Sequence, residues 1–273
     1  MLDERYERRI FFLATVRKMS ASEIKAHMDL NVSVWTIQRT LLKNPHATFS
    51  KLIAAPVLRA THKLNRLIFA ERHVPDPTIW TWVVFSDEKK FNLDGPDGFH
   101  YFWQDVRKDR EVLSKRQSGG GGLMVWGGFS VQGTTDLCFL EGRINSTKYC
   151  TVLENYLLPY GHNVMLDNWV FQQDNAPIHV STKTRNWMEV HDIKLMDWPS
   201  KSPDLNPMEN MWGLLVRDVY DNGRHQFVRK EDLRQELVAA WGRIPLSKLD
   251  GLIASMPKRC MDVIKCGGNK VDY

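Results

Sequence analysis

The sequence predicts an α/β protein in which a mixed sheet with flanking helices follows a small all-α unit. Its 273 residues are 43% apolar and 25% charged, which is within the range of globular domains. Helical periodicity runs up to about residue 45, and from residue 79 onward strand-like and helix-like segments alternate. We therefore divide the chain into a helical unit (1–44), a linker with one helix (45–78) and a large α/β domain (79–273).

Three short helices are expected in the first unit, over residues 4–17, 20–28 and 34–43. Ser20 and Glu23 have the spacing of a capping box, and Ser33 is positioned to cap the third helix. The apolar positions that we expect to form its small core are Ile10, Leu13, Ile24, Leu30, Val34, Ile37 and Leu41.

The outer face of the third helix is polar and carries one aromatic residue. Its side chains are of the types that reach base edges and phosphates from a helix in the major groove of DNA. An ordinary helical subdomain with solvated charges explains this stretch equally well. The candidate DNA-contacting residues are Ser33, Trp35, Thr36, Gln38, Arg39 and Lys43.

The rest of the chain is predicted to contain six helices and a series of short strands. We expect a helix at 61–72, a strand ending at Ser86, a short strand at Phe91, a Gly-Pro-Asp-Gly turn and a third run at 99–103. Further strands are expected at 123–130, 134–142, 169–173 and 193–196. The remaining helices are expected at 145–161, 181–190 and 207–218, with two more within 231–264.

Several classes of protein are excluded by composition. No apolar run approaches the roughly 18 residues that a membrane helix needs, and the opening MLDERYERRIFF lacks the pattern of a secretory signal. The four cysteines show no paired zinc spacing, so we expect reduced, buried thiols. A net charge of +5 and a pI near 9.0 fit a polyanion-binding surface without proving one.

Two acids directly follow strands that are predicted to be buried. Asp87 comes after Trp-Val-Val-Phe-Ser, and Asp174 comes after Trp-Val-Phe-Gln-Gln. Each could be an ordinary turn aspartate. Glu209 lies in the first turn of the helix opened by Pro207, where Asn206 and Glu209 also form a good capping box, and for this segment alone we favour the cap.

Three carboxylates converging from two strands and a helix would form an oxygen-only site. Such a site suits Mg²⁺ or Mn²⁺ and is poor for zinc. It can hold two ions about 4 Å apart, which is the arrangement for in-line displacement at a phosphodiester. The reaction predicted from this trio is phosphoryl transfer on nucleic acid.

Four blocks of sequence resemble the catalytic domain of the Tc/mariner transposases. They are FSDEKKFNLDGPDG, GGGLMVWGGFS, FQQDNAPIH and DWPSKSPDLNPMENMW, in the order found in the family. The 34 residues between Asp174 and Glu209 match the spacing of the Tc branch. The resemblance covers residue 50 to the end, and it implies a ribonuclease-H-like fold with a DDE triad of Asp87, Asp174 and Glu209 that binds two divalent ions.

The resemblance also implies cut-and-paste transposition. Water attacks the phosphodiester at an element end, and the freed 3′-hydroxyl then attacks target DNA at a TA dinucleotide. The implied partners are double-stranded DNA with terminal inverted repeats and a second copy of the chain in a homodimer, with no membrane. The implied location is the nucleus.

The N-terminal region departs from the family pattern. Residues 4–43 resemble the second of two helix-turn-helix units, and the chain starts at Met1 where the linker after the first unit should end. We therefore expect weak binding to an inverted repeat and reduced transposition. The alternatives are a transposase-derived or relic DNA-binding protein without transposition activity, and a ribonuclease-H-like nuclease acting on RNA–DNA hybrids.

Other residues are weaker candidates. We expect Asn175, His179 and Asp204 to support the acids, although a structural histidine is the commoner outcome. Gly119 to Gly122 lack the Lys-Ser/Thr partner of a phosphate loop. The residues Trp198, Pro199 and Pro203 are expected to shape the turn before the Glu209 helix. The basic residues Lys258, Arg259 and Lys265 are expected to contact DNA phosphates or to be solvated.

Overall fold

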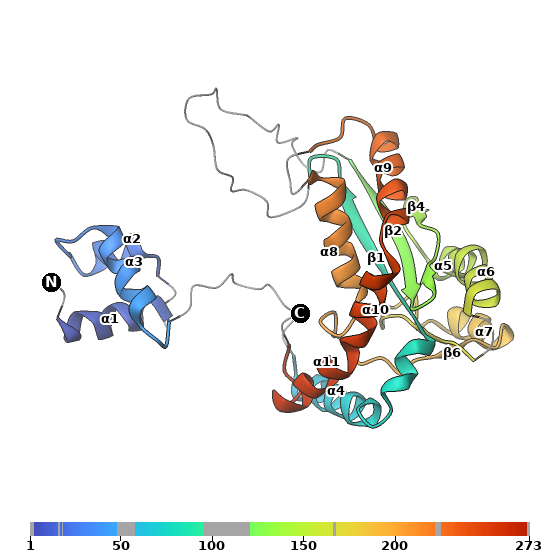
Figure 1. Cartoon of the computed structure of the whole chain (residues 1–273), viewed down its shortest axis with the longest axis horizontal. Helices are drawn as coiled ribbons and strands as arrows, with labels where there is room; N and C mark the ends of the chain where they lie inside the picture. The colour runs from blue at the N-terminus through green and yellow to red at the C-terminus, as the bar shows by residue number, and fades with distance from the viewer. Residues whose placement is uncertain are drawn as a thin grey trace. The chain divides into compact units, whose positions relative to one another are not determined.

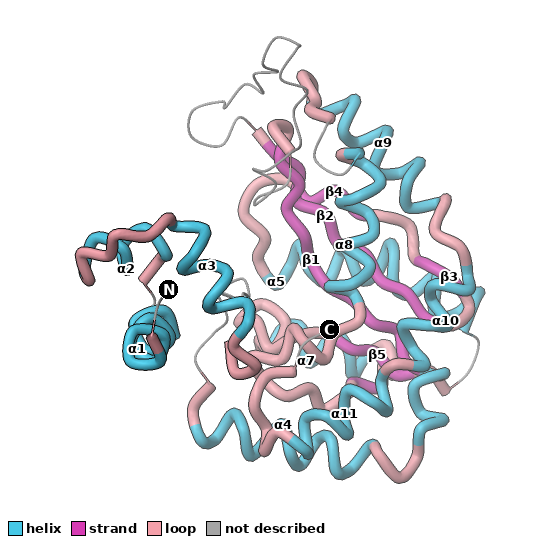
Figure 2. Tube along the Cα trace, turned by 60° about the vertical axis from the view of Figure 1, so that its left-hand side comes forward, coloured by secondary structure: helices cyan, strands magenta, loops and turns pink. Residues whose placement is uncertain are grey.

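The computed structural model describes residues 3–15, 17, 19–47, 58–95, 121–165, 168–221 and 225–271. The chain forms two compact units, Met1–Pro56 and Val57–Tyr273. Helix α4 (Ala60–His73), which we grouped with the linker, packs against α11 (Met256–Lys265) in the second unit. The two helices lie side by side in Figure 1 and in Figure 2.

The first unit has the three expected helices, α1 (Glu4–Thr15), α2 (Ala21–His27) and α3 (Val34–Lys43). The Ser20–Glu23 capping box and the Ser33 cap are both confirmed. Val34 is only half-buried and lies outside the core, because it is the first residue of α3 and follows the cap directly. The buried core residues are Ile10, Leu13, Ile24, Leu30 and Ile37, with Leu41 partly buried beside them.

A mixed sheet with flanking helices forms the centre of the second unit, as predicted (Figure 1). Its main path runs β3-β2-β1-β5-β6, and β4 also pairs with β2. The β1–β2 pair is antiparallel, whereas β1–β5 and β5–β6 are parallel. The strands are β1 (Val83–Asn92), β2 (Gly122–Ser130), β3 (Gly133–Thr134), β4 (Cys138–Leu140), β5 (Val170–Gln172) and β6 (Lys194–Leu195).

Strand β1 differs from the prediction of two separate strands at Ser86 and Phe91. It is one continuous strand, because β2 pairs with it from Phe85 through Asn92. For the 134–142 segment we predicted one strand, but the structure has two, β3 and β4, which both pair with β2. The predicted run at 99–103 and the glycines at 119 and 120 lie outside the described residues.

Helices cover both faces of the sheet, and the alternation along β1 divides the core between them. Val83 and Phe85 belong to the large cluster formed with α4, α8, α9, α10 and α11, whereas Val84 packs with α5 and α7 on the other face. These helices are α5 (Ser146–Val152), α7 (Thr182–Val190), α8 (Met208–Val219), α9 (Lys230–Gly242) and α10 (Leu246–Ala254). Short helical segments complete the fold at Pro77–Trp82, Leu153–Leu157, Leu158–Tyr160 and Gly161–Met165.

The C-terminal region contains three helices where we expected two. Pro245 is the N-cap of α10, and Pro257 lies in the first turn of α11, so both prolines stand where a helix can begin. Among the described helices, none is long and apolar enough to cross a membrane. All four cysteines are free thiols, and Cys266 is half-buried where we expected burial.

Candidate active site

Asp87 lies within β1 and not, as predicted, after the end of a strand. Parallel pairing with β5 stops at Phe85, while antiparallel pairing with β2 continues past Asp87, which is opposite Gly127. The indole Nε1–H of Trp212 on α8 donates a 3.0 Å hydrogen bond to Asp87 Oδ2. A Cβ at Gly127 would approach the Trp212 ring to 3.2 Å. Gly127 therefore leaves the room that the Trp212 ring needs to reach Asp87.

Asp174 follows β5 at the start of a tight turn, as the sequence predicts. Its Oδ1 accepts a 2.8 Å hydrogen bond from the Ala176 backbone N–H and is 2.6 Å from His179 Nδ1. The Asp174 side chain remains 56% exposed. Burial raises the pKa of this carboxyl, but the hydrogen bonds from His179 and Ala176 outweigh it and leave the pKa below its usual value.

His179 links the Asp174 turn to β1. The ring is buried, and its Nδ1 is 2.6 Å from Asp174 Oδ1. Its Nε2 is 3.3 Å from Glu88 Oε1 and does not make a hydrogen bond with any described residue. The ring also packs on Tyr149, with 4.2 Å between centroids. Burial lowers the pKa of His179, but the neighbouring Asp174 and Glu88 raise it to about 9. His179 is therefore protonated at neutral pH and carries a charge opposite to theirs.

Glu209 is the second residue of α8 and does not form the capping box that we favoured for this segment. The Asn206 backbone N–H donates to the Pro203 carbonyl, which replaces the reciprocal contact from Glu209. The Asn206 side chain does cap the helix, since its Oδ1 accepts from the Met208 N–H. Its Nδ2–H₂ donates to the Ser86 carbonyl at 3.1 Å. Asn206 therefore holds the start of α8 against the residue that precedes Asp87.

The charges of neighbouring acids converge on Asp87. Burial, followed by the negative charges of Glu209 and Glu88, raises the pKa of Asp87 to about 7, despite hydrogen bonds from the Glu88 backbone and Trp212 that lower it. Among the described residues, no three acidic, histidine or cysteine side chains already form a cation-binding cluster. Glu209 and Glu88 thus lie close enough to Asp87 for their negative charges to disfavour its ionised form.

Asn175 connects two loops of the site. Its Nδ2–H₂ donates a 2.8 Å hydrogen bond to the Trp198 carbonyl, in the segment that leads to α8. Trp198 is buried and packs edge-on against Phe69, with centroids 5.2 Å apart. The Asp174 turn and the loop before Glu209 are thereby joined.

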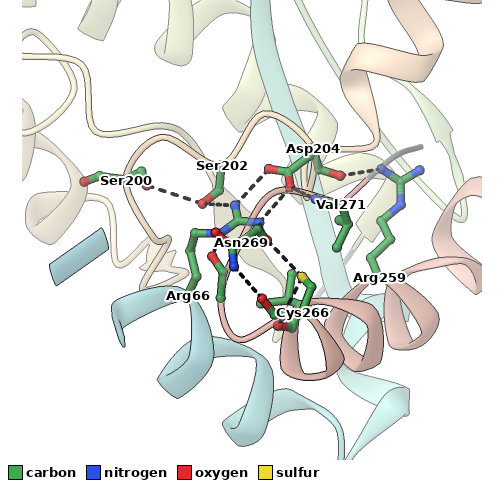
Figure 3. Close-up of polar contacts among 10 residues, drawn as sticks. Arg66, Ser200, Ser202, Asp204, Arg259, Cys266, Asn269 and Val271 are labelled. Carbon is green, nitrogen blue, oxygen red and sulfur yellow. Dashed lines mark hydrogen bonds and ion pairs between the residues drawn. The ribbon is translucent and has the colours of Figure 1, made fainter. Parts of the chain in front are cut away.

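Asp204 does not support the acids directly, and in this respect the prediction was wrong. Its carboxylate accepts hydrogen bonds from both terminal nitrogens of the buried Arg66, at 2.8 and 2.6 Å, and from the Val271 N–H (Figure 3). Arg259 is neither solvated nor available to DNA, because it is buried and donates to the Asp204 carbonyl and to Asn210 Oδ1. These contacts join α4, α8, α11 and the C-terminal segment.

The other basic candidates on α11 are exposed. Lys258 and Lys265 each lie within ion-pair distance of Asp262, at 3.0 and 3.6 Å. The last two glycines of the 119–122 run are Gly121, which has φ +93°, and Gly122, which opens β2. A Cβ at Gly122 would come within 2.8 Å of the Phe91 carbonyl, so this glycine permits the close approach of β1.

The candidate DNA-contacting residues lie on the first unit. Trp35 is 61% exposed, and Gln38, Arg39 and Lys43 are exposed as well. The Ser33 and Thr36 hydroxyls are 2.9 Å apart, and Ser33 Oγ also accepts from the Thr36 N–H. The outer face of α3 therefore presents two cations, an amide and an indole, while Ser33 serves the cap.

Glu88, Asn206 and Trp212 are site residues that the sequence analysis missed. Glu88 was indicated by its place next to Asp87, and Trp212 by its position three residues after Glu209 on the same helical face. Nothing in the sequence predicts the contact of Asn206 with Ser86, because the two residues are 120 positions apart.

Comparisons with known proteins show which family the chain belongs to. The family model for the DDE superfamily endonuclease matches residues 82–234. The chain is 42% identical to the Tc3 transposase of Caenorhabditis elegans over its whole length and 82% of that relative. It is 35% identical to the Tcb2 transposase of Caenorhabditis briggsae over 92% of each chain.

Solved structures show the same fold. The paired-end complex of the mariner Mos1 transposase with Mg superposes with a TM-score of 0.77 at 16% identity, covering 100% of this chain and 82% of that one. The Mos1 strand transfer complex gives a TM-score of 0.75 at 15% identity, over 100% and 81% of the two chains.

The fold and the sequence match define a DDE endonuclease with a ribonuclease-H-like sheet. The chain belongs to the Tc/mariner transposases, the enzymes of cut-and-paste DNA transposition.

Proposed function

We propose that Asp87, Asp174 and Glu209 are the catalytic triad and that they hold two divalent cations, Mg²⁺ or Mn²⁺. The observation that carries this proposal is the convergence of acidic charge on Asp87, whose pKa of about 7 reflects burial and the nearby Glu209 and Glu88. Carboxylate oxygens are the donors that these hard cations prefer. A bound cation would relieve the repulsion that this set of acids creates.

The cations would supply activation of the attacking oxygen and stabilisation of the leaving oxygen during displacement at a phosphodiester. The protein supplies orientation. Trp212 holds Oδ2 of Asp87, and His179 and Ala176 hold Oδ1 of Asp174. Asn206 fixes the helix start that carries Glu209. The three acids are thus positioned by groups from separate elements, as such chemistry requires.

The proposed substrate is double-stranded DNA. Water attacks at the ends of an element flanked by inverted repeats, and the freed 3′-hydroxyl joins target DNA at TA. The exposed face of α3, with Trp35, Gln38, Arg39 and Lys43, is the proposed contact with the repeat. Replacing Arg39 by Ala should weaken binding to duplex DNA and lower its dependence on salt.

The proposed assembly is a homodimer on two element ends, and the proposed location is the nucleus. The support for the dimer is the 42% identity to a Tc3 transposase, together with the fold shared with the Mos1 paired-end complex. Sedimentation with and without an inverted-repeat duplex tests the dimer. A fluorescent fusion expressed in a eukaryotic cell tests the location.

Substitution of the acids tests the triad. Asp174→Asn and Asp87→Asn should each abolish strand cleavage while leaving DNA binding in EDTA at the wild-type level, since each removes a metal ligand and not a DNA contact. Asp197→Asn, which changes an 83% exposed acid, is the matched control and should cleave normally. Wild-type nicking by Asp174→Asn would refute the assignment.

Thermal unfolding provides a second measurement that does not depend on cleavage. Mg²⁺ or Mn²⁺ should raise the Tm of the wild-type protein, because a ligand of the native state stabilises it by mass action. The same ions should leave the Tm of the Asp87→Asn and Asp174→Asn proteins nearly unchanged.

A further inference from the structure

A groove lies between α8 and the outer part of β1, next to the proposed triad. Its volume is about 350 Å³, and it includes Glu209 itself together with Trp212, the residue that donates to Asp87. The groove therefore opens onto the acids. Lys89 and Lys90 line it on the β1 side, and Glu209, Trp212, Gly213 and Val216 line it on the α8 side.

Two lysines give the β1 side of the groove positive charge. Beyond Phe85, β1 pairs only with β2 among the described strands, so no strand in the described part of the chain lies beside its other edge. Lys89 and Lys90 are consecutive in this segment, and both line the groove, one half-buried and one exposed. In the part of the chain that the structure describes, neither ammonium group takes part in a hydrogen bond or ion pair. Both are available to an anion.

Gly213 forms the opposite wall, on α8. A glycine inside a helix costs about 1 kcal/mol relative to alanine. A Cβ at Gly213 would meet nothing within 4 Å, so the packing of the protein does not require glycine here. Positions 209, 212, 213 and 216 form one face of α8, and that face lines the groove. The missing side chain at its centre widens the groove next to Glu209.

We propose that this groove binds one strand of DNA beside the bond that is cut, with its phosphates on Lys89 and Lys90 and its sugars against α8 at Gly213. The volume is within the range of small-ligand pockets, and it accommodates a nucleotide or two of a single strand. The inference rests on the proposed function, because it takes Glu209 as part of the triad.

Binding of a fluorescein-labelled twelve-nucleotide single strand to the full chain in EDTA tests the charge of the groove. The Lys89→Ala/Lys90→Ala protein should bind about tenfold more weakly, and its log-log salt slope should fall by about 0.7 for each lost phosphate contact. Lys194→Ala/Lys248→Ala removes two exposed lysines, on β6 and α10, and should leave affinity and slope unchanged. Wild-type affinity and slope in the Lys89/Lys90 variant would overturn the inference.

Gly213 variants test the shape of the groove. Gly213→Leu should weaken binding of the same strand about tenfold, whereas Gly251→Leu, at an equally open position in α10, should not. Gly213→Ala should unfold at the same or a higher temperature, which shows that the helix tolerates a side chain there. Equal affinities of Gly213→Leu and Gly251→Leu would contradict the proposal.

Disulfide trapping locates the strand and separates groove binding from binding by the first unit. By thiol–disulfide exchange, Gly213→Cys should capture a single strand whose phosphate tether ends in a mixed disulfide, with release of the small thiol, well above the level of Gly251→Cys. Equal capture by the two proteins would overturn the groove proposal. The triad proposal fails on a different result, namely wild-type nicking by Asp174→Asn, so the two failures are distinguishable.

Discussion

Asp87 has a pKa of about 7 because it is partly withdrawn from water and lies near two other acids. Between the unfolded value of 3.8 and about 7, the native state binds a proton at Asp87 that the unfolded state lacks. Native stability therefore falls as the pH rises through this window. Above pH 7, Asp87 is ionised in both states, and its charge lowers the stability of the metal-free protein by the full amount.

Asp87→Asn should remove this dependence on pH. In EDTA between pH 4.5 and 6.5, the free energy of unfolding of the wild-type protein should fall by roughly 2 kcal/mol relative to the variant. His179 contributes little within this window, because its stabilisation is fully present below the unfolded value of 6.5 and is lost only as the pH rises through about 9. Urea unfolding at the two pH values measures the difference, and parallel profiles would show that the pKa of Asp87 is not raised.

At the scale of elements, the site depends on how α8 is joined to β1. The Asn206 amide contacts both the Ser86 carbonyl and the Met208 N–H, so the helix that carries Glu209 starts next to Asp87. Trp212 makes a second connection, one turn further along, to Asp87 itself. Small displacements of a positioned catalytic group can cost about a hundredfold in rate. We therefore expect the contact between α8 and β1 to affect activity as well as stability.

Asn206→Ala should cost about 1–2 kcal/mol of stability and at least about tenfold in cleavage rate. Asn145→Ala is the matched control, because Asn145 caps α5 through the Lys148 N–H. It should cost about 1 kcal/mol and leave the rate unchanged. Denaturant unfolding measures the loss of stability in both proteins, and single-turnover cleavage measures the loss of rate. A similar loss of rate in both would mean that Asn206 acts only through general stability.

At the scale of the whole second unit, a buried ion pair joins its two ends. Arg66 on α4 pairs with Asp204 at 2.6 Å and also donates to the Gly268 and Asn269 carbonyls (Figure 3). A buried guanidinium needs this set of acceptors, because an uncompensated charge in the interior is costly. Arg259 extends the network to Asn210, next to Glu209. The last part of the chain thus helps to hold the helix that carries a proposed catalytic acid.

Removing one partner of the pair should be more harmful than removing both. Arg66→Met or Asp204→Leu alone should cost about 3–5 kcal/mol, which corresponds to a drop in Tm of about 10 °C. The double variant Arg66→Met/Asp204→Leu should recover much of that loss, because neither charge is then buried without its partner. Thermal unfolding of the three proteins tests this, and additive losses in the double variant would contradict it.

Local and periodic features of the sequence determined the class of fold and most of its elements. The capping residues Ser20, Ser33 and Ser181 open their helices where predicted, because a cap is a contact between residues three apart. Long, specific motifs around Asp87, Asp174 and Glu209 predicted the family, which the comparisons confirmed. The acids themselves could be named because each lies in such a motif.

Only the tertiary structure decided features that depend on residues far apart in the chain. The continuity of β1 follows from pairing with β2 across a gap of some thirty residues, and the cap at Asn206 is oriented by a carbonyl 120 positions away. Asp204 and Arg259 were misassigned because burial and partner choice determine what a charged side chain does, and neither is written in local sequence. The sequence by itself therefore determined the family and predicted the acids of the proposed triad, whereas the tertiary structure decided which groups contact those acids.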